Sequence, residues 1–484
     1  MTKGHIFESL LPMSIEPILL EKLNDGIIAA PALHLTRRDA QLPLISGKAH
    51  TVIGLRRTGK SCFLRQLQSD LRATLPPERA VYISFDDDRL SNVNLAQLDM
   101  LLEEYYRRYP ELRGCETVHW FFDEIQLVEG WERFVRRILD SEKVEIVVSG
   151  SSARMLSREV HTSLRGRAME TVIRPFSFRE FLRHREEEPD AAVEKLTSAR
   201  RSRLEKHFRE YLVEGGFPEA QGLLQTVRVQ LLQGYVDTVL FRDIVERYGV
   251  SQVAALRWLI RQCLRNPAGS FSVHRLYNDL KSQGHGIAKD AVHAMFACLL
   301  DAFLISAIPI ATESERQRNS NPRKIYPADT GLINAFDISG RSNLGHALET
   351  AVLLELKRRQ AEVFYVKTPQ GYEVDFLARY LSGEEELIQV AAEIGTADTA
   401  ERELCALAEA GRQFPRARKR LLTMTREIMP REAPDDVIAE PAYVWMLSST
   451  QTLSCNYTTL LGNILSVGSM CHFLKHNDIA GLGN

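Results

Sequence analysis

Short apolar segments alternate with longer amphipathic segments through the first third of the chain. The short segments, typical of buried β-strands, cover residues 50–53, 81–85, 118–122, 144–148 and 171–173. Helical patterns separate them, with apolar residues recurring every three or four positions. This alternation predicts a parallel sheet with helical crossovers between residues 49 and 175.

The later parts of the chain follow other patterns. Residues 176–250 show helical periodicity and almost no strand signal, and their dense charge favours solvated helices over a linker. Residues 251–335 predict three helices followed by two strands, at 304–309 and 324–326, around a polar loop at 313–323. Residues 340–450 return to mixed α/β patterning, with a last strand expected at 443–447.

Composition narrows the functional classes. The chain has 61 Lys and Arg against 63 Asp and Glu, which excludes a globally basic nucleic-acid binder but not a local basic patch. Seven cysteines without a CxxC pair predict neither a zinc site nor a disulfide framework, so a reducing cytoplasm is expected. Residues 441–474 contain no Asp, Glu, Lys or Arg, but Ser, Thr, Asn and Gln interrupt them, so no membrane role is expected.

The strongest motif follows the first strand and precedes a helical pattern. It matches G-x-x-x-x-G-K-[ST] in full, and the expected nucleotide-binding residues are Gly54, Leu55, Arg56, Arg57, Thr58, Gly59, Lys60, Ser61 and Cys62. The glycines let backbone N–H groups point at phosphate oxygens, and the following helix adds partial positive charge. Lys60 is expected to reach the β- and γ-phosphates of ATP, and the Ser61 hydroxyl to bind Mg²⁺.

Two carboxylates follow the apolar run at 120–122. Asp123 is expected to hold Mg²⁺, and Glu124 to orient and deprotonate the attacking water. An apolar run ending in Asp-Glu also occurs wherever a strand leaves the core. Its position after the phosphate loop, with one strand between, favours the catalytic interpretation.

Two further residues are candidates for sensing the γ-phosphate. Ser149 ends the next strand, between the loop and the carboxylates, with Ser151 as its substitute, although a Ser/Gly turn or a helix cap is an alternative. Arg167 is the candidate arginine finger, a residue that often acts from a neighbouring subunit, which makes a homo-oligomer a candidate assembly. A solvated helix face is the alternative for Arg167.

Taken together, these motifs resemble the AAA-type P-loop ATPases. More narrowly, the chain resembles a bacterial and archaeal family in which the ATPase core precedes a winged helix and a domain of unknown function with a restriction-endonuclease-like fold. The matching segments are residues 54–61, 122–126, 149–152, 164–167, 175–181, 214–218 and 373–376, within a resemblance that covers 35–448. The resemblance implies ATP binding and leaves the biological purpose open.

The resemblance also divides the chain. The expected parts are a lead-in (1–48), a P-loop ATPase core (49–175), a helical lid (176–250), a winged helix (251–338), a restriction-endonuclease-like domain (339–450) and an unassigned tail (451–484). The fold class is therefore α/β, with a parallel AAA-type sheet and helical lid, then a winged helix, then an α/β endonuclease-like domain.

Nuclease activity is not expected of the last domain. The resemblance places Glu349 and Asp375 at two metal-binding positions, but the third position holds Gln389 and Ala391 instead of an acid and a lysine. Lys367 is a candidate spatial substitute for the missing lysine. The basic segment 412–420 is interpreted either as a solvated loop or as a phosphate-backbone contact.

These observations predict a Mg²⁺-dependent ATPase that couples its nucleotide state to a C-terminal module. That module is expected to bind a protein partner or DNA. In the winged-helix segment, the start of the second helix (287–291) offers one cation and one anion, a set poorly suited to reading DNA bases. The alternatives are a nucleotide-gated interaction or DNA-binding switch with little turnover, and an ATP-dependent nuclease.

Overall fold

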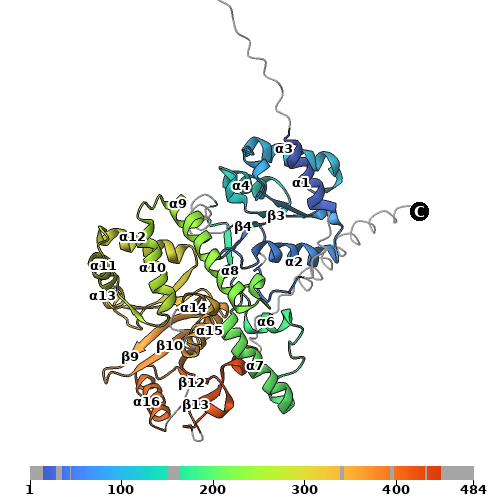
Figure 1. Cartoon of the computed structure of the whole chain (residues 1–484). Coiled ribbons are helices and arrows are strands. Elements are labelled where there is room, and N and C mark those ends of the chain that lie inside the picture. Colours follow the sequence, from blue (N-terminus) through green and yellow to red (C-terminus); the bar gives the residue numbers. More distant parts are fainter. Residues whose placement is uncertain are drawn as a thin grey trace, which may run out of the picture.

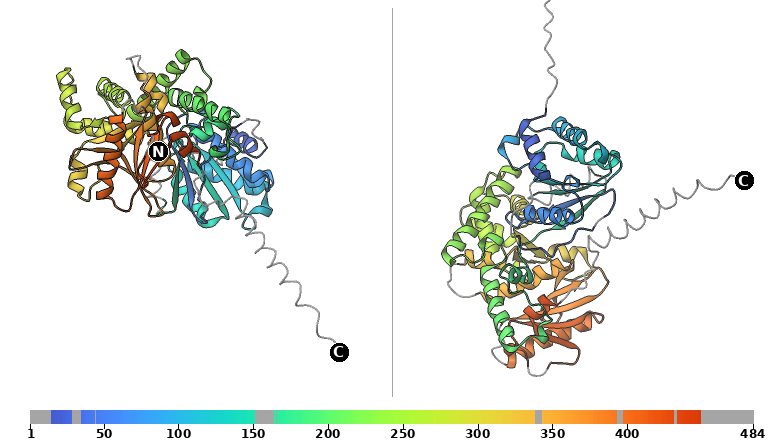
Figure 2. Two further views of the ribbon diagram at one scale, coloured as in Figure 1. Left: turned by 90° about the horizontal axis from the view of Figure 1, so that it is seen from below. Right: turned by 90° about the vertical axis from the view of Figure 1, so that its right-hand side faces the viewer.

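The computed structural model describes residues 15–28, 35–43, 45–150, 164, 166–337, 343–392, 397–430 and 433–448. Three sheets with their helices make up these residues (Figure 1). The parallel sheet and the C-terminal sheet lie at opposite ends of the molecule. The helical segments between them in sequence run along one side and link the two (Figure 2).

The amino-terminal sheet has the strand order β2-β3-β4-β1-β5, and every neighbouring pair is parallel. Its strands are β1 (Ala49–Ile53), β2 (Ala80–Ser84), β3 (Val118–Asp123), β4 (Val144–Ser149) and β5 (Ala168–Val172). Their apolar runs are buried because helices cover both faces, as in other parallel sheets. The expected five-stranded parallel sheet is confirmed, although the fifth strand begins earlier than residue 171.

Four described helices cover this sheet: α1 (Pro17–Ile28), α2 (Lys60–Arg72), α3 (Leu95–Arg108) and α4 (Trp131–Ser141). One face carries an aromatic cluster in which the Trp120 ring stacks on Phe122 and meets Tyr105 of α3 edge-on. The other face packs against α2 through Phe63 and Leu64. Full burial of a Phe or Leu side chain stabilises the fold by about 1.5–3 kcal/mol.

Residues 178–250 are helical, as their periodicity predicts. They form α6 (Phe178–His184), α7 (Ser198–Glu214), α8 (Gln225–Thr238), a π-helical segment (Val239–Val245) and α9 (Glu246–Tyr248). A capping box between Ser177 and Glu180 starts α6. Helices α6 and α7 share a core with the C-terminal part of the chain, whereas α8 and the π-helical segment share one with the helices that follow.

Residues 253–336 combine helices with a small antiparallel sheet of order β6-β8-β7. The elements are α10 (Val253–Arg265), β6 (Ser270–Phe271), α11 (Val273–Ser282), α12 (Lys289–Asp301), β7 (Ile305–Ile308), α13 (Glu315–Ser320), β8 (Arg323–Pro327) and α14 (Thr330–Phe336). The three helices followed by two strands are present where the pattern predicts them. The polar loop between β7 and β8 contains the short helix α13.

The C-terminal sheet has the order β13-β12-β11-β10-β9 and is mixed: β9, β10 and β11 are antiparallel, whereas β11, β12 and β13 are parallel. Its elements are α15 (Leu344–Arg358), β9 (Glu362–Lys367), β10 (Glu373–Arg379), β11 (Glu385–Ala391), α16 (Ala397–Gln413), β12 (Arg418–Thr423), β13 (Val437–Pro441) and α17 (Ala442–Leu447).

The expected last strand at 443–447 is wrong, because these residues form helix α17. The strand lies just before them and ends at Pro441, whose φ of −64° suits the start of a helix. All six residues of α17 are buried. A short run that is apolar on every side does not distinguish a buried strand from a buried helix, which explains the error.

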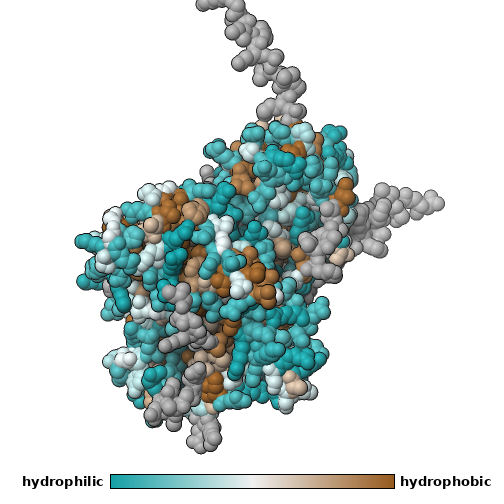
Figure 3. Space-filling model, viewed as in Figure 1, coloured by the Kyte–Doolittle hydropathy of each residue, from teal (hydrophilic) through white to brown (hydrophobic). Residues whose placement is uncertain are grey.

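The visible surface is mainly hydrophilic, and its apolar side chains form small separate groups (Figure 3). Leu224 and Leu381 are among the most exposed large apolar residues. Scattered exposure of this kind is ordinary for a folded chain in water. Within the described ranges, no helix is both long enough and apolar enough to cross a bilayer.

A buried ion pair joins the segment before β1 to helix α6. The Arg38 Nε lies 3.0 Å from a carboxylate oxygen of Glu180, and both side chains are about 5% exposed or less. The same guanidinium donates hydrogen bonds to the carbonyl oxygens of Thr58 (2.7 Å) and Arg174 (2.5 Å). Burial alone would raise the pKa of Glu180, but Arg38 outweighs burial and lowers it.

Substitution of Arg38 should strongly destabilise the amino-terminal sheet and the helices packed on it. Arg38→Met leaves the Glu180 carboxylate buried without its cation, so we expect the free energy of unfolding to fall by about 3–5 kcal/mol. The matched control is Arg37→Met, because Arg37 is 62% exposed and pairs with the partly exposed Asp70. The control should cost about 1 kcal/mol or less. Urea unfolding followed by tryptophan fluorescence measures both, and equal midpoints would contradict the assignment.

Candidate functional site

The loop between β1 and α2 has the backbone geometry of a phosphate cradle. Gly54 has a φ of 145°, and a Cβ at this position would lie 2.2 Å from the Ile173 carbonyl oxygen. Gly59 has a φ of 92° and directly precedes α2, so the helix N-terminus opens into the loop. Thr58 closes the loop from within, because its hydroxyl donates to the Leu55 carbonyl at 2.9 Å.

Lys60 lies inside this loop and is 6% exposed. Its ammonium group donates to the carbonyl oxygens of Gly54 (3.0 Å) and Leu55 (3.1 Å). Burial lowers the pKa of Lys60, and the carboxylates of Glu124 and Asp123 oppose that effect. A phosphate anion in the loop would give this buried cation a stronger partner than neutral carbonyls.

Asp123 ends β3 beside the ends of both neighbouring strands, and it is 3% exposed. One carboxylate oxygen accepts a hydrogen bond from the Tyr82 hydroxyl of β2 at 2.7 Å, and the other accepts one from the Ser149 hydroxyl of β4. The Ser149 hydroxyl oxygen also accepts the backbone N–H of Glu124 at 3.1 Å. The Ser149 hydroxyl therefore joins the Asp123 side chain to the backbone of Glu124, and its expected role in sensing the γ-phosphate stays a prediction.

Glu124 has an unusual backbone for a non-glycine residue, with a φ of 53°. This left-handed conformation turns the chain sharply after β3, and Gln126 donates a hydrogen bond to the Glu124 carboxylate. Burial raises the pKa of Glu124, and the Lys60 cation opposes it. A carboxylate with a raised pKa is a stronger base, which suits a residue that accepts a proton from water.

The donor set at this edge of the sheet fits a magnesium ion bound together with phosphate. Ser61 is exposed on the first turn of α2, and Asp123 supplies a fixed carboxylate. Mg²⁺ commonly takes only one or two protein oxygens and completes its shell with water and phosphate. Accordingly, no group of three or more His, Cys, Asp or Glu side chains in the described segments is arranged to hold a metal. Cys62 is exposed beside Ser61, and the substitute sensor Ser151 lies outside the described residues.

Arg167 is not brought to the phosphate loop of its own chain. Its carbonyl oxygen accepts the N–H of Ala49 at 2.8 Å, which places it beside the start of β1. The loop follows the other end of β1, five residues and roughly 16 Å away. The Arg167 side chain is 45% exposed and pairs with Asp140.

Several residues that shape the loop were missed by sequence reasoning. Arg38 contacts Thr58, and Tyr82 contacts Asp123. Asp243 contacts Arg56. A signal existed only for Tyr82, because it lies on the strand that a parallel sheet pairs with β3. Arg38 and Asp243 carry no motif, and Asp243 is separated from Arg56 by 187 positions.

Both arginines of the loop are ion-paired to later helices. The Arg56 Nε lies 2.9 Å from both carboxylate oxygens of Asp243, in the π-helical segment. Arg57 has a φ of 65° and lies 3.2 Å from Glu219, which also accepts a hydrogen bond from the Tyr235 hydroxyl. The loop is thus connected through two side chains to residues 219–243.

A second charged cluster lies where the β6-β8-β7 sheet meets α15 and the C-terminal sheet. Lys324 of β8 is 4% exposed, and its ammonium lies 3.3 Å from Glu349, 2.8 Å from Glu373 and 3.2 Å from Asp375. The Tyr326 hydroxyl donates to Glu349 at 2.7 Å. Burial alone would lower the pKa of Lys324, but the three carboxylates outweigh it and raise that pKa.

This cluster bears on the residues expected from the nuclease resemblance. Glu349 and Asp375 do lie together, but the lysine beside them is Lys324 and not Lys367, which is 47% exposed and reaches Glu373 alone. Gln389 lies beside this cluster: its amide oxygen accepts the Asp375 N–H at 3.3 Å, and its amide nitrogen donates to Glu403 at 2.6 Å.

The basic segment 412–420 is largely neutralised by carboxylates. Four of its cations have acidic partners in the chain: Arg412 with Glu409, Arg418 with Glu384, Lys419 with Asp436, and Arg420 with Glu386 and Glu440. Such pairing favours the interpretation as a solvated surface over that as a phosphate-backbone contact.

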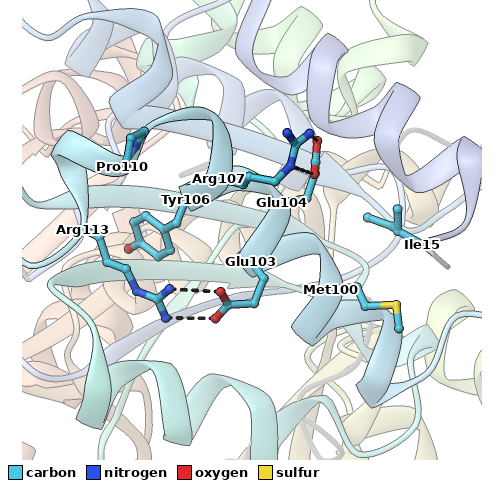
Figure 4. Close-up of a pocket in the computed structure, with 8 residues that line it drawn as sticks. All are labelled: Ile15, Met100, Glu103, Glu104, Tyr106, Arg107, Pro110 and Arg113. Atoms are coloured by element: carbon cyan, nitrogen blue, oxygen red, sulfur yellow. Dashed lines mark hydrogen bonds and ion pairs between the residues drawn. The ribbon is translucent and has the colours of Figure 1, made fainter. Parts of the chain in front are cut away.

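A cavity of about 540 Å³ lies beside α3, and no phosphate-loop residue lines it (Figure 4). It is lined by Ile15, Met100, Glu103, Glu104, Tyr106, Arg107, Pro110 and Arg113. Its charges pair with one another, since Arg113 lies 2.9 Å from Glu103 and Arg107 lies 2.7 Å from Glu104. The cavity therefore offers a ligand no unpaired charge, and the phosphate loop with its acidic pair stays the candidate functional site.

Two family models match the chain, one describing an AAA domain at residues 46–182 and one a domain of unknown function (DUF8612) at residues 205–343. An uncharacterised protein of Methanocaldococcus jannaschii, MJ1544, is 33% identical over 396 residues, which are 81% of this chain and 85% of that protein. An uncharacterised protein of Haemophilus influenzae is 29% identical over 345 residues, 71% of this chain and 82% of its own length.

Solved structures are similar only distantly. The Walker-type ATPase PABY2304 of Pyrococcus abyssi has a TM-score of 0.33 and 17% identity, covering 66% of this chain and 95% of that one. The ORC1 protein of Aeropyrum pernix, solved in complex with DNA, has a TM-score of 0.26 and 17% identity, covering 60% and 86%. Likenesses of this size assign no ligand or partner to the chain.

Removal of the Lys324 cation should destabilise the protein in a pH-dependent way. Lys324→Met leaves buried carboxylates without a cation, and we expect a loss of about 3–5 kcal/mol in the free energy of unfolding at pH 7. Burial, with Asp375 adding to it, already raises the pKa of Glu349, and loss of the ammonium raises it further. The folded state then keeps protons that the unfolded chain releases near pH 4.5, so stability falls as pH rises above that value.

The destabilisation should accordingly be smaller at pH 5 than at pH 8, as measured by urea unfolding. Lys367→Met is the matched control, because that lysine is half exposed and pairs with Glu373 alone. The control should cost about 1 kcal/mol or less at either pH. A pH-independent loss in Lys324→Met would show that the carboxylates do not depend on this cation.

Proposed function

The chain belongs to the family of AAA-domain proteins that includes protein MJ1544 of Methanocaldococcus jannaschii, and we propose that it hydrolyses ATP in the presence of Mg²⁺. A single observation carries this proposal. The loop lysine Lys60 and the residues Asp123, Glu124 and Ser149 converge at the carboxyl edge of one parallel sheet. No other cluster in the described residues combines a phosphate cradle with a buried base.

The loop residues account for phosphate binding. Backbone N–H groups of the loop and the N-terminus of α2 donate to the phosphate oxygens, and Lys60 exchanges its two carbonyl partners for them. Ser61 and Asp123 would hold Mg²⁺, which neutralises negative charge on the phosphates when it is bound. Tyr82 and Ser149 keep the Asp123 carboxylate in one orientation through hydrogen bonds to its two oxygens.

Glu124 is the base in this scheme. It orients a water molecule in line with the γ-phosphate and accepts its proton, which its raised pKa favours. Ser149 fixes the backbone at Glu124, and we assign to it the sensing of the γ-phosphate. Arg167 acts only on a neighbouring subunit, since it lies at the opposite edge of its own sheet. That role requires a homo-oligomer.

Residues 253–327 are proposed to form a winged helix that receives the nucleotide signal. The arrangement of α10, α11 and α12 with the sheet β6-β8-β7 supports this assignment. The output is proposed to be contact with a protein partner, with DNA as the alternative. The paired charges of segment 412–420 favour the protein partner.

A second candidate is a nucleotide-gated switch with little turnover. The ion pairs of Arg56 with Asp243 and of Arg57 with Glu219 favour it, because they tie the loop to helices outside the AAA domain. In this alternative the output is a conformational change, and hydrolysis resets it. Turnover with and without added protein, DNA or RNA distinguishes a motor from a switch.

Two substitutions test the ATPase proposal. Lys60→Ala should abolish binding of a fluorescent ATP analogue, because it removes the buried cation of the loop. Glu124→Gln should retain binding while turnover falls by roughly 100-fold or more, since proton transfer contributes about 10²–10⁴-fold. Phosphate release and fluorescence titration are the measurements. Wild-type turnover in both variants would contradict the assignment.

The C-terminal domain is proposed to lack nuclease activity. Lys324 neutralises the Glu349 and Asp375 carboxylates, and Ala391 supplies no lysine at the usual position. We therefore expect no nicking of supercoiled plasmid with Mg²⁺ or Mn²⁺, with or without ATP. Nicking that disappears in Asp375→Ala would overturn this expectation, whereas nicking that persists there would indicate contamination.

A further inference from the structure

Arg56 stands out because it is a phosphate-loop residue whose partner lies outside the AAA domain. Its Nε contacts both carboxylate oxygens of Asp243 at 2.9 Å. The two side chains differ in exposure, with 36% for Arg56 and 4% for Asp243. The carboxylate is therefore the fixed partner, and the guanidinium extends from it into an accessible region beside the loop.

The form of this ion pair leaves most of the guanidinium available. From this guanidinium Asp243 accepts the Nε–H group alone, and the four N–H bonds on the two terminal nitrogens of Arg56 have no hydrogen-bond partner among the described residues. A purely structural arginine buried between two elements normally uses its terminal nitrogens, as Arg38 does with Thr58 and Arg174. An arginine held by Nε alone is oriented and still able to bind an anion.

The position of Arg56 agrees with this. Arg56 directly follows Leu55, whose carbonyl oxygen accepts a hydrogen bond from the Lys60 ammonium at 3.1 Å. Arg56 is therefore the neighbour in sequence of a residue that holds the loop lysine, on the loop expected to bind the phosphates.

We propose that Arg56 binds the terminal phosphate of ATP from within the same chain, and that Asp243 is the positioning residue that aims it. This inference rests on the proposed ATPase function. It supplies a cation for the γ-phosphate that Arg167 does not reach in its own chain. It also adds a direct path from the nucleotide to the helices after the AAA domain.

The element that carries Asp243 is suited to transmit the signal. Residues Val239–Val245 form a π-helical segment, a rare conformation that is frequent at functional sites. Leu240 and Ile244 of this segment are buried in the same core as Leu256 and Leu259 of α10. A change in the Arg56–Asp243 contact therefore reaches the first helix of the following unit directly.

The affinity ratio between ATPγS and ADP tests this inference. Binding of each nucleotide with Mg²⁺ is measured by titration calorimetry for the wild type, Arg56→Gln, Asp243→Asn and the double variant. A charge-assisted hydrogen bond to the γ-phosphate predicts a loss of roughly 10- to 100-fold for ATPγS in Arg56→Gln, with ADP affinity changed by less than about threefold. Asp243→Asn should act in the same direction but less strongly.

The double variant separates positioning from an independent effect. Because Asp243 acts through Arg56, the double variant should bind ATPγS no more weakly than Arg56→Gln alone. Arg107→Ala is the control for loss of an arginine–carboxylate pair at a remote site, since it pairs with Glu104 on α3. It should leave the affinity ratio unchanged.

The outcomes distinguish this inference from the proposed function. An unchanged ratio in Arg56→Gln, an equal loss for both nucleotides, or additive losses in the double variant would overturn it while ATP binding stands. Absence of any Lys60-dependent nucleotide binding by the wild type would overturn both. If Arg56→Gln does not fold, the single variants Asp243→Asn and Arg56→Lys replace it in the comparison of ATPγS with ADP. Lysine has no Nε–H for Asp243 to hold, so Arg56→Lys removes the positioning contact.

Discussion

The buried guanidinium of Arg38 is the contact on which the nucleotide site depends. It neutralises Glu180, whose carboxylate also caps α6, and it supports the carbonyl oxygen of Thr58 inside the phosphate loop. A charge this deeply buried is stable only when its partners are in place, so this contact links the stability of the loop, the end of the sheet and α6. The loop is therefore a preorganised cradle whose shape is determined before any phosphate arrives.

The parallel sheet determines where the chemistry lies. Parallel strands leave the sheet at the same edge, so Tyr82, Asp123 and Ser149 meet there although they are far apart in sequence. The same geometry places Arg167 at the opposite edge, beside the start of β1. One chain thus holds the cradle and the base at one edge and presents an exposed arginine at the other.

Charge pairing accounts for much of the segment 412–420 and of the arginines after β5, in a chain with 61 cations and 63 anions. The arginines after β5 pair with acids of neighbouring segments, as Arg183 does with Asp39 and Glu188. Lys324 does the same in the interior, where it joins the β6-β8-β7 sheet to the C-terminal sheet. In these examples ion pairs connect parts of the chain that lie far apart in sequence.

The sequence by itself determined the parallel sheet, the phosphate loop and the acidic pair after β3. These are local features: a strand, a tight turn and a helix follow one another within a few residues, and their patterns need no distant partner. The sequence also put Ser149 near Asp123, because neighbouring parallel strands end at the same edge of the sheet. It misassigned α17, where an apolar run bounded by Pro441 fits either a strand or a helix.

Only the tertiary structure decided which distant side chains complete the sites. Arg38, Asp243 and Lys324 carry no motif, and each meets its partners through packing between elements. Side-chain pairing over such separations depends on how helices and sheets pack, and neither hydrophobic periodicity nor spacing encodes that in a readable form. The sequence therefore identified the phosphate loop and the acidic pair beside it, while the fold decided what holds the loop and to which helices it is connected.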